Sequence, residues 1–272
     1  MLKINDLKLI DNEILQEFEL SLNTIKNLFD GEYKFTSELC FIYMNNSDFI
    51  KDSILDLVER ENFYSVNILY RSLIEHFLRF NYFFFNFGLE GKNNEYSKKF
   101  RTALVFADKL SIMKSRNSAD KIKKVIEKTE KQIQQDVYGS SDNFQKYNLE
   151  ELLSFSKKIS IKNIINFTEN HIGKNNPVPN DFLIDILIRY SKQSSYVHGG
   201  IFAHQEFSNF ASKSEENRLI NLTVIYGLSL KTATFIKIYS YLILSKIEPK
   251  LLDYYFKITT SIMKMTPNYN CR

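Results

Sequence analysis

Apolar residues recur at intervals of three and four along nearly the whole chain, the spacing that places side chains on one face of an α-helix. Only eight Gly and four Pro occur in 272 residues, which leaves few of the turns that a β-protein needs. The pattern therefore predicts an all-α fold. The expected helices cover residues 5–29, 36–59, 62–87, 93–115, 118–137, 148–158, 161–172, 181–198, 214–247 and 249–265.

Several of these segments carry residues that begin or end helices. Ser118, Asn148 and Asn180 each precede an amphipathic run, and each has a side-chain oxygen that accepts a hydrogen bond from a free amide of a first helical turn. Gly88 and Gly199 stand where a helix is expected to stop in a left-handed conformation. Such signals locate helix ends to within about 2–4 residues.

The segment at about 91–147 is the most polar part of the chain, and its second half is rich in Lys and Glu. A narrow apolar stripe of this kind is typical of an exposed helix or helical hairpin. We therefore expect a polar helical excursion from a single all-helical domain that spans residues 1–272. Its lysines either contact phosphates or form only a solvated face. The apolar residues of that second half are Ile122, Val125, Ile126, Ile133 and Val137.

The helix expected at 62–87 combines a buried character with charge. It is apolar on nearly all sides, yet Asn67, Arg71, Glu75 and Arg79 follow one another at four-residue spacing and form a polar stripe. An unpaired charge on a buried helix costs several kcal/mol, so Arg71 and Glu75 need a partner. One interpretation is an ion-pair ladder that orients the helix. The other is a cation, held by Glu75, that faces a cleft and receives an anion.

The stretch "YSKQSSYVHGGIFAH", residues 190–204, holds two of the four histidines, His198 and His204. In a helix over 181–198, His198 shares a stripe with Ser194 at the polar end. A histidine titrates near neutral pH, which suits proton transfer. The alternative is a helix end whose histidine only complements the helix dipole. Gly199 and Gly200 allow a sharp turn and the close approach of a ligand.

Motifs for metal, cofactor or hydrolase chemistry do not accompany these histidines. His198 and His204 lie six residues apart with no Asp, Glu or Cys between them, and the Glu-x-x-His spacing of di-iron bundles is absent. G-x-S-x-G, the P-loop and the dinucleotide fingerprint are absent too. Cys40 and Cys271 have neither metal nor redox spacing. The sequence therefore predicts no metal and no cofactor.

Composition and charge narrow the class of protein only slightly. The chain is 44% hydrophobic and 25% charged, which is typical of a globular protein. A net charge of +4 is compatible with nucleic acid and equally with an ordinary, slightly basic protein. The start "MLKINDLKLIDNE" is unlike a signal peptide, and no uninterrupted apolar run is long enough to span a membrane. We expect a cytoplasmic location and no membrane association.

Two stretches together, "LYRSLIEHFLRF" (69–80) and "YSKQSSYVHGG" (190–200), resemble the HEPN superfamily, whose name stands for higher eukaryote and prokaryote nucleotide-binding. The likeness is to an uncharacterised bacterial branch. The resemblance implies an up-down helical bundle, here with additional helices, that often dimerises so that two sites share a cleft. Many members are metal-independent ribonucleases of toxin–antitoxin, abortive-infection and CRISPR-linked defence systems. Others are inactive binding scaffolds.

The resemblance assigns His198 as the motif histidine, and Arg71 and Glu75 as the pair on the partner helix. The family signature places an Arg four to six residues before the His. At those positions this chain offers only Lys192 as a cation, and lysine neutralises a phosphate without the bidentate fork of arginine. Arg189 lies nine residues before His198, on the opposite side of a continuous helix, and would serve only if the helix breaks.

The chemistry implied by the resemblance is transesterification of RNA. His198 exchanges a proton with the ribose 2′-OH or the leaving 5′-oxygen, while Arg71 and Lys192 stabilise the negative charge that develops on the phosphate. A tyrosine of the same helix, Tyr190 or Tyr196, stacks on an unpaired base. The products are a 2′,3′-cyclic phosphate and a 5′-hydroxyl. The expected substrate-binding residues are Ser194, Tyr196, Tyr190, Arg189 and His204.

Three functions remain open on the sequence alone. The first is a HEPN-like endoribonuclease that acts as a toxin or phage-defence effector, with RNA as substrate, a homodimeric state, and an antitoxin or defence-system protein as candidate partner. The second is a non-catalytic HEPN-like module that binds nucleotide, RNA or a partner protein, which the missing Arg favours. The third is a structural helical adaptor. The His-Gly helix end, Ser194 and the Arg71–Glu75 pair favour the first.

Overall fold

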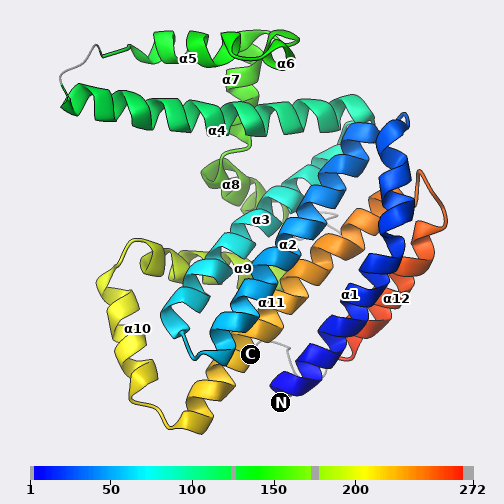
Figure 1. The fold of residues 1–272 in the computed structure, drawn as a ribbon, viewed down its shortest axis with the longest axis vertical. Coiled ribbons are helices and arrows are strands. Elements are labelled where there is room, and N and C mark those ends of the chain that lie inside the picture. Colours follow the sequence, from blue (N-terminus) through cyan, green and yellow to red (C-terminus); the bar gives the residue numbers. More distant parts are fainter. Residues whose placement is uncertain (1–2, 124–126, 173–177, 266–272) are drawn as a thin grey trace.

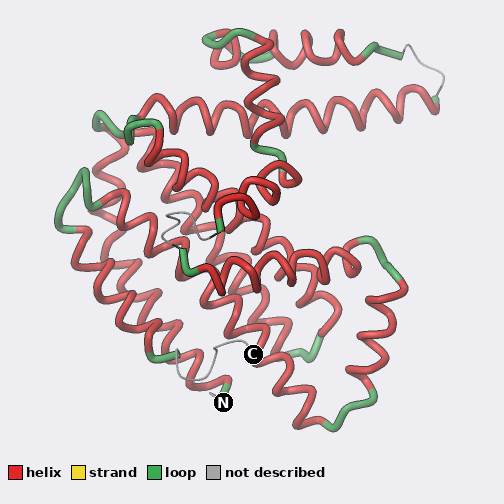
Figure 2. The backbone as a smooth tube through the Cα atoms, turned by 180° about the vertical axis from the view of Figure 1, so that it is seen from behind, coloured by secondary structure: helices red, strands yellow, loops and turns green. Residues whose placement is uncertain are grey.

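The computed structural model describes residues 3–123, 127–172 and 178–265, and every regular element in these ranges is a helix (Figure 2). The prediction of an all-α fold is therefore confirmed. In chain order the elements are α1 (Ile4–Asn27), the short 3-10 helix η1 (Leu28–Asp30), α2 (Lys34–Glu59), α3 (Phe63–Leu89), α4 (Asn94–Ile122), α5 (Glu130–Gly139), α6 (Asp142–Gln145), α7 (Leu149–Lys158), α8 (Ile161–His171), α9 (Asn180–Val197), α10 (Ile201–Ala211), α11 (Glu215–Leu244) and α12 (Leu251–Met263).

Three long helices form the centre of the molecule. α11 packs against both α2 and α3, which also pack against each other, and α1 and α12 lie along the outer side of this group (Figure 1). α3 and α11 bury side chains on nearly all sides, as their apolar sequences require. α9 crosses α3 away from this centre, and α10 follows it. The site helices α3 and α9 therefore differ: α3 is central, whereas α9 has an exposed outer face.

α11 is the one described helix that is long and apolar enough to cross a membrane. The most apolar part of it is 67% buried inside the protein, and a buried core helix meets the same criteria of length and composition. The burial explains why this helix is apolar all round. The cytoplasmic location stays a prediction.

A cluster of buried charges joins α1, α2 and α11. The ammonium group of Lys51 contacts the carboxylates of Asp11 and Asp48. The ammonium group of Lys237, a residue of α11, also contacts Asp48. The Tyr226 hydroxyl donates to Asp11 at 2.6 Å. Both lysines are only 1% exposed, so their charges need these partners. The sequence did not predict this cluster.

The two buried lysines differ in their electrostatic surroundings. Burial lowers the pKa of Lys51, but the carboxylates of Asp11, Asp48 and Asp52 outweigh it and the net shift is upward. Burial also lowers the pKa of Lys237, and here the attraction of Asp48 does not compensate. Lys51 is therefore the more firmly charged member of the cluster.

The polar excursion is a helical hairpin at one end of the molecule. α4 runs across that end and α5 lies above it, while α7 and α8 lead back to α3 (Figure 1). Ile133 and Val137 are the buried residues of α5, as its apolar stripe predicts. Ile122 is exposed at the end of α4, and Val125 and Ile126 lie outside the described residues, as does Cys271.

Some predicted helix boundaries in this region are wrong. Ser118 does not cap a helix, because it lies inside α4, where its hydroxyl donates to the Lys114 carbonyl at 3.1 Å. The next helix starts twelve residues later, after Thr129, whose side chain accepts from the Gln132 amide. Asn148 does cap α7, accepting from the Glu150 amide at 2.8 Å.

The remaining helix ends show where local signals succeed and fail. Gly199 is left-handed with φ 62°, as predicted. Gly88 lies within α3, and the left-handed turn comes instead at Gly91, with φ 78°. Asn180 is the first residue of α9 rather than its cap. The pattern also missed α10, since only Ala203 and Phe210 of this helix are buried and its amphipathic contrast is weak.

Candidate functional site

The packing of α3 against α9 brings the two stretches that resemble the HEPN superfamily into direct contact. Arg71 of α3 donates from Nη2 to the Tyr190 hydroxyl at 3.0 Å and from Nε to the Ser194 hydroxyl at 3.2 Å. Its guanidinium carbon lies 4.9 Å from the centre of the Tyr190 ring, a cation–π distance. Three residues predicted for the site are therefore neighbours, although Arg71 lies more than a hundred positions before Tyr190 and Ser194 in the chain.

Glu75 closes a ring of polar contacts around Arg71. Its Oε1 lies 3.1 Å from Arg71 Nη2 and accepts a hydrogen bond from the Tyr190 hydroxyl, also at 3.1 Å. The side chains of Arg71 and Glu75 are 15% and 26% exposed. Burial, followed by the negative charge of Glu75, raises the pKa of Tyr190. The tyrosine thus stays neutral and donates to the carboxylate at neutral pH.

Further hydrogen bonds join α3 to α9 beside the Arg71 contacts. The buried Gln193 amide donates to the Asn67 side chain at 2.9 Å. The Tyr64 hydroxyl donates to the Tyr196 carbonyl at 2.9 Å. Gln193 was not among the predicted site residues. Its spacing of three from Tyr190 was the signal, because it puts both side chains on the face that meets the α3 stripe.

His198 forms the end of α9, where its amide donates to the Ser194 carbonyl at 3.3 Å. Its side chain is exposed. Residues four apart on a helix are neighbours on one face, with Cβ atoms about 5–6 Å apart. Ser194, which binds Arg71, therefore lies one turn before His198 on the same side of α9. His198 thus lies one helical turn beyond the residue that binds Arg71.

The glycines after His198 have a conformational role. Gly199 reverses the chain, and the Gly200 amide donates to the Ser195 carbonyl at 2.8 Å. A Cβ atom on Gly200 would lie 2.5 Å from the Ser195 hydroxyl oxygen, which itself accepts from the Ala203 amide at 3.2 Å. A Cβ atom at position 200 would therefore force the Ser195 hydroxyl to turn away from the Ala203 amide.

The other predicted cations are held by carboxylates. Lys192 pairs with Glu206 of α10 at 2.9 Å and lies 5.6 Å from the centre of the Phe202 ring. Arg189 pairs with Asp185 of its own helix at 2.7 Å. Lys192 is half exposed, so its ammonium can still reach a ligand at the surface. Arg71, by contrast, is joined to Ser194.

The predicted substrate-binding residues Tyr196, Tyr190 and His204 differ in exposure. Tyr196 is only 2% exposed, with its ring packed against Phe63 and Tyr64 at centroid distances of 6.0 and 5.3 Å. The prediction that Tyr196 stacks on a base is therefore wrong, because its faces are already covered. Tyr190 is half-buried and remains the aromatic residue of this site. His204 is exposed on α10.

The described residues contain no group of three or more His, Cys, Asp or Glu side chains arranged to hold a metal ion. The chemistry that the site offers comes from an exposed imidazole, a fixed guanidinium and a half-exposed ammonium. Compared with known proteins, the chain matches no family model, no curated protein and no solved structure.

Proposed function

We propose that this chain is a HEPN-like, metal-independent endoribonuclease that acts as a toxin or phage-defence effector. One observation carries the proposal: Arg71 is bonded to Ser194, one helical turn before the exposed His198. A fixed guanidinium and an exposed imidazole are suitable groups for a phosphodiester, since one stabilises negative charge and the other moves a proton. The mild positive charge of the chain agrees with an RNA substrate.

Each residue has a defined part in the proposed reaction. The neutral His198 imidazole accepts the proton of the ribose 2′-OH, whose oxygen then forms a bond to phosphorus. The bond from phosphorus to the 5′-oxygen breaks, and that oxygen takes a proton from solvent. The Arg71 guanidinium stabilises the extra negative charge on the phosphate. The products are a 2′,3′-cyclic phosphate and a 5′-hydroxyl.

Arg71 can bind a phosphate although its guanidinium already forms an ion pair with Glu75. A guanidinium carries five N–H donors, and the contacts with Glu75, Tyr190 and Ser194 use Nε and Nη2. Within the described part of the chain, Nη1 makes no hydrogen bond. Glu75 and Tyr190 fix the orientation of the guanidinium plane, and the N–H groups of Nη1 remain available to donate to a phosphate oxygen.

A cleavage assay in the presence of a metal chelator tests the proposal. Purified protein should cut single-stranded RNA with EDTA present and release fragments that end in a 2′,3′-cyclic phosphate. Cleavage only after Mg²⁺ addition, or fragments with a 3′-hydroxyl end, would contradict the proposed chemistry.

A non-catalytic HEPN-like module that binds RNA, nucleotide or a protein is the second candidate. It is favoured because both cations near His198 already have carboxylate partners, Arg71 with Glu75 and Lys192 with Glu206. Binding of RNA without any cleavage, in buffers with and without divalent metal, would select it over the nuclease.

A homodimer is part of the proposal, and the exposed apolar side chains indicate where its interface lies. The apolar side chains of α11 are mostly buried within one chain, so this helix offers little apolar surface to a partner. Apolar side chains are exposed instead on α9 and α10, and contiguous exposed apolar surface often marks an interface. A second copy that covers this surface would set two His198 residues near one cleft. The exposed apolar residues of α9 and α10 are Ile184, Ile188, Val197, Ile201, Phe202 and Phe207.

Sedimentation at about ten micromolar should therefore show a dimer, a choice of concentration suited to a modest interface. Replacing Ile201 and Phe207 with Ser should give a monomer without loss of helical content. A wild-type protein that stays monomeric would contradict the dimer.

A further inference from the structure

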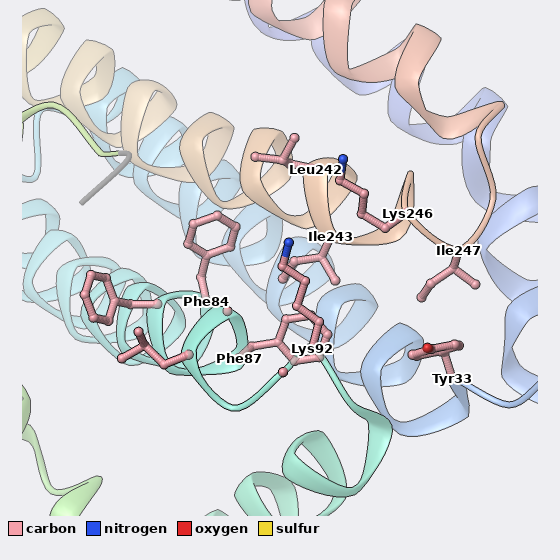
Figure 3. Close-up of a pocket in the computed structure, with 12 residues that line it drawn as sticks. Tyr33, Phe84, Phe87, Lys92, Leu242, Ile243, Lys246 and Ile247 are labelled. Carbon is pink, nitrogen blue, oxygen red and sulfur yellow. The ribbon is translucent and has the colours of Figure 1, made fainter. Parts of the chain in front are cut away.

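A cavity of about 750 Å³ lies far from His198, between the end of α3, the end of α11 and the start of α2. This volume is within the range of about 300–1,000 Å³ that is typical of small-molecule sites. Phe84 and Phe87 of α3 form one wall, and Leu242 and Ile243 of α11 form the opposite wall (Figure 3). None of the residues that line this cavity is part of the proposed ribonuclease site.

The cavity has few polar side chains, and both of the charged ones are positive. Its lining side chains carry only the Tyr33 hydroxyl and the ammonium groups of Lys92 and Lys246. Lys92 extends from the loop after α3 toward Ile243, and Lys246 rises from the end of α11 beside Leu242 (Figure 3). In the described part of the chain, neither ammonium pairs with a carboxylate. The cavity therefore combines an apolar interior with two positive charges.

The backbone holds Lys92 at this place. Gly91 and Lys92 are both left-handed, with φ values of 78° and 56°, and a lysine rarely adopts this conformation. The Lys92 amide donates to the Phe87 carbonyl at 2.9 Å, the longer bond of a Schellman motif that ends α3. The same turn that ends the helix thus sets the lysine at the rim of the cavity.

We infer that this cavity binds a single-chain amphiphile with an anionic head group, its hydrocarbon tail between α3 and α11 and its head on Lys92 and Lys246. An apolar cavity favours an apolar occupant over water. Two unpaired ammonium groups favour a carboxylate or phosphate over a neutral or cationic head. A nucleotide fits less well, because a base needs hydrogen-bond partners along its edge and the side chains here supply only one hydroxyl.

Calorimetric titration of the full chain with dodecyl ligands, kept below their critical micelle concentrations, tests the inference. Dodecanoate and dodecyl phosphate should each bind saturably at one site, and the stronger of the two identifies the preferred head group. Dodecyl maltoside and dodecyltrimethylammonium should bind at least about tenfold more weakly, since they lack the negative charge. Each CH₂ group that enters the cavity should strengthen binding up to about fourfold, so decanoate should be the weaker carboxylate.

Variants locate the site. Lys92→Ala and Lys246→Ala should each weaken dodecanoate binding about fivefold, the scale of an exposed ion pair. Lys131→Ala, at an exposed position on α5, is the matched control and should leave binding unchanged. Leu242→Trp should fill the cavity and abolish binding, while circular dichroism verifies that the variant is folded. Should it fail to fold, the two alanine variants still decide the question.

The inference is overturned by the absence of saturable binding of either anionic ligand, by equal binding of the neutral maltoside, or by unchanged affinity in both alanine variants. Binding of AMP that dodecanoate does not displace would leave the inference intact. Tighter binding of AMP than of dodecanoate, with displacement, would overturn it.

Discussion

Replacing Lys237 with Met tests whether the buried ion pair between α11 and α2 stabilises the folded protein. Lys237 is 1% exposed and contacts Asp48, which also has Lys51 at 3.6 Å. Removing one partner of a buried ion pair costs about 3–5 kcal/mol, because a charge is left uncompensated in an apolar interior. Asp48 would keep Lys51, so we expect a loss near the lower end, about 3 kcal/mol. Methionine has a similar volume and creates little cavity.

A double-mutant cycle separates the ion pair from packing. Asp48→Asn also leaves Lys237 without its carboxylate, whereas the double variant removes both charges of the pair. We therefore expect the double variant to lose at least about 2 kcal/mol less than the sum of the two single losses. Urea unfolding followed by far-UV circular dichroism gives each free energy. Lys131→Met, on the exposed face of α5, should leave the free energy of unfolding unchanged.

Two outcomes would refute this reasoning. One is a loss below about 1 kcal/mol for each single variant, the scale of an exposed ion pair. The other is simple addition of the two single losses in the double variant, because additivity would show that the two side chains do not interact.

Three further predictions concern pH, the turn after α9 and the Arg71 contacts. Burial lowers the pKa of His76 to about 4, so the unfolded chain binds a proton that the folded protein does not, and stability present above pH 6.5 is lost as pH falls toward 4. In the wild type this group should lower the free energy of unfolding by about 2 kcal/mol between pH 7 and pH 5, and urea unfolding of His76→Leu should show this contribution removed. Gly200→Ala should lower the free energy of unfolding by about 1 kcal/mol, because the Ser195 hydroxyl must turn away from the new Cβ and loses its hydrogen bond with the Ala203 amide, and in a Ser195→Ala background the same change should cost less. Arg71→Ala should abolish RNA cleavage and also destabilise the protein by about 2–3 kcal/mol, since it leaves Glu75 without a cation. Adding Glu75→Gln should restore stability in a thermal melt but not activity.

The sequence predicted a helix well where the apolar spacing of that segment alone is enough to identify it. The three-four spacing located the long helices, and the all-apolar character of 62–87 predicted a buried α3. It failed for α10, whose weak amphipathic contrast reflects how little of it is buried. It also failed at Ser118, because a serine before an amphipathic run resembles a cap even where the helix continues through it.

The candidate site was predictable only in part, for a related reason. Helical periodicity showed that Arg71 and Glu75 share a stripe, and the resemblance paired this stripe with Ser194 and His198. Periodicity carries no information about partners on other helices. The pairing of Lys192 with Glu206 depends on α10, which was not predicted.

The buried ions illustrate the same limit more strongly. Asp11, Lys51 and Lys237 each look like solvent-facing residues of their own helix. Their contacts join residues that are 40 and 189 positions apart. Only the packing of α1, α2 and α11 shows that these charges face one another, and the cavity at Lys92 and Lys246 likewise exists only once α3 and α11 are in place.

The most direct test of the proposed ribonuclease is to compare His198→Ala with His204→Ala in RNA cleavage with EDTA present. Loss of a positioned proton-transfer group should slow His198→Ala about a hundred- to ten-thousand-fold. Its free energy of unfolding should fall by only about 0.3–1 kcal/mol, the contribution of a charge at a helix end. His204→Ala should have only a mild effect, because His204 lies past the glycine turn and is expected to contact substrate but not to move the proton. Equal cleavage by His198→Ala and the wild type would contradict the assignment of His198 as the residue that moves the proton.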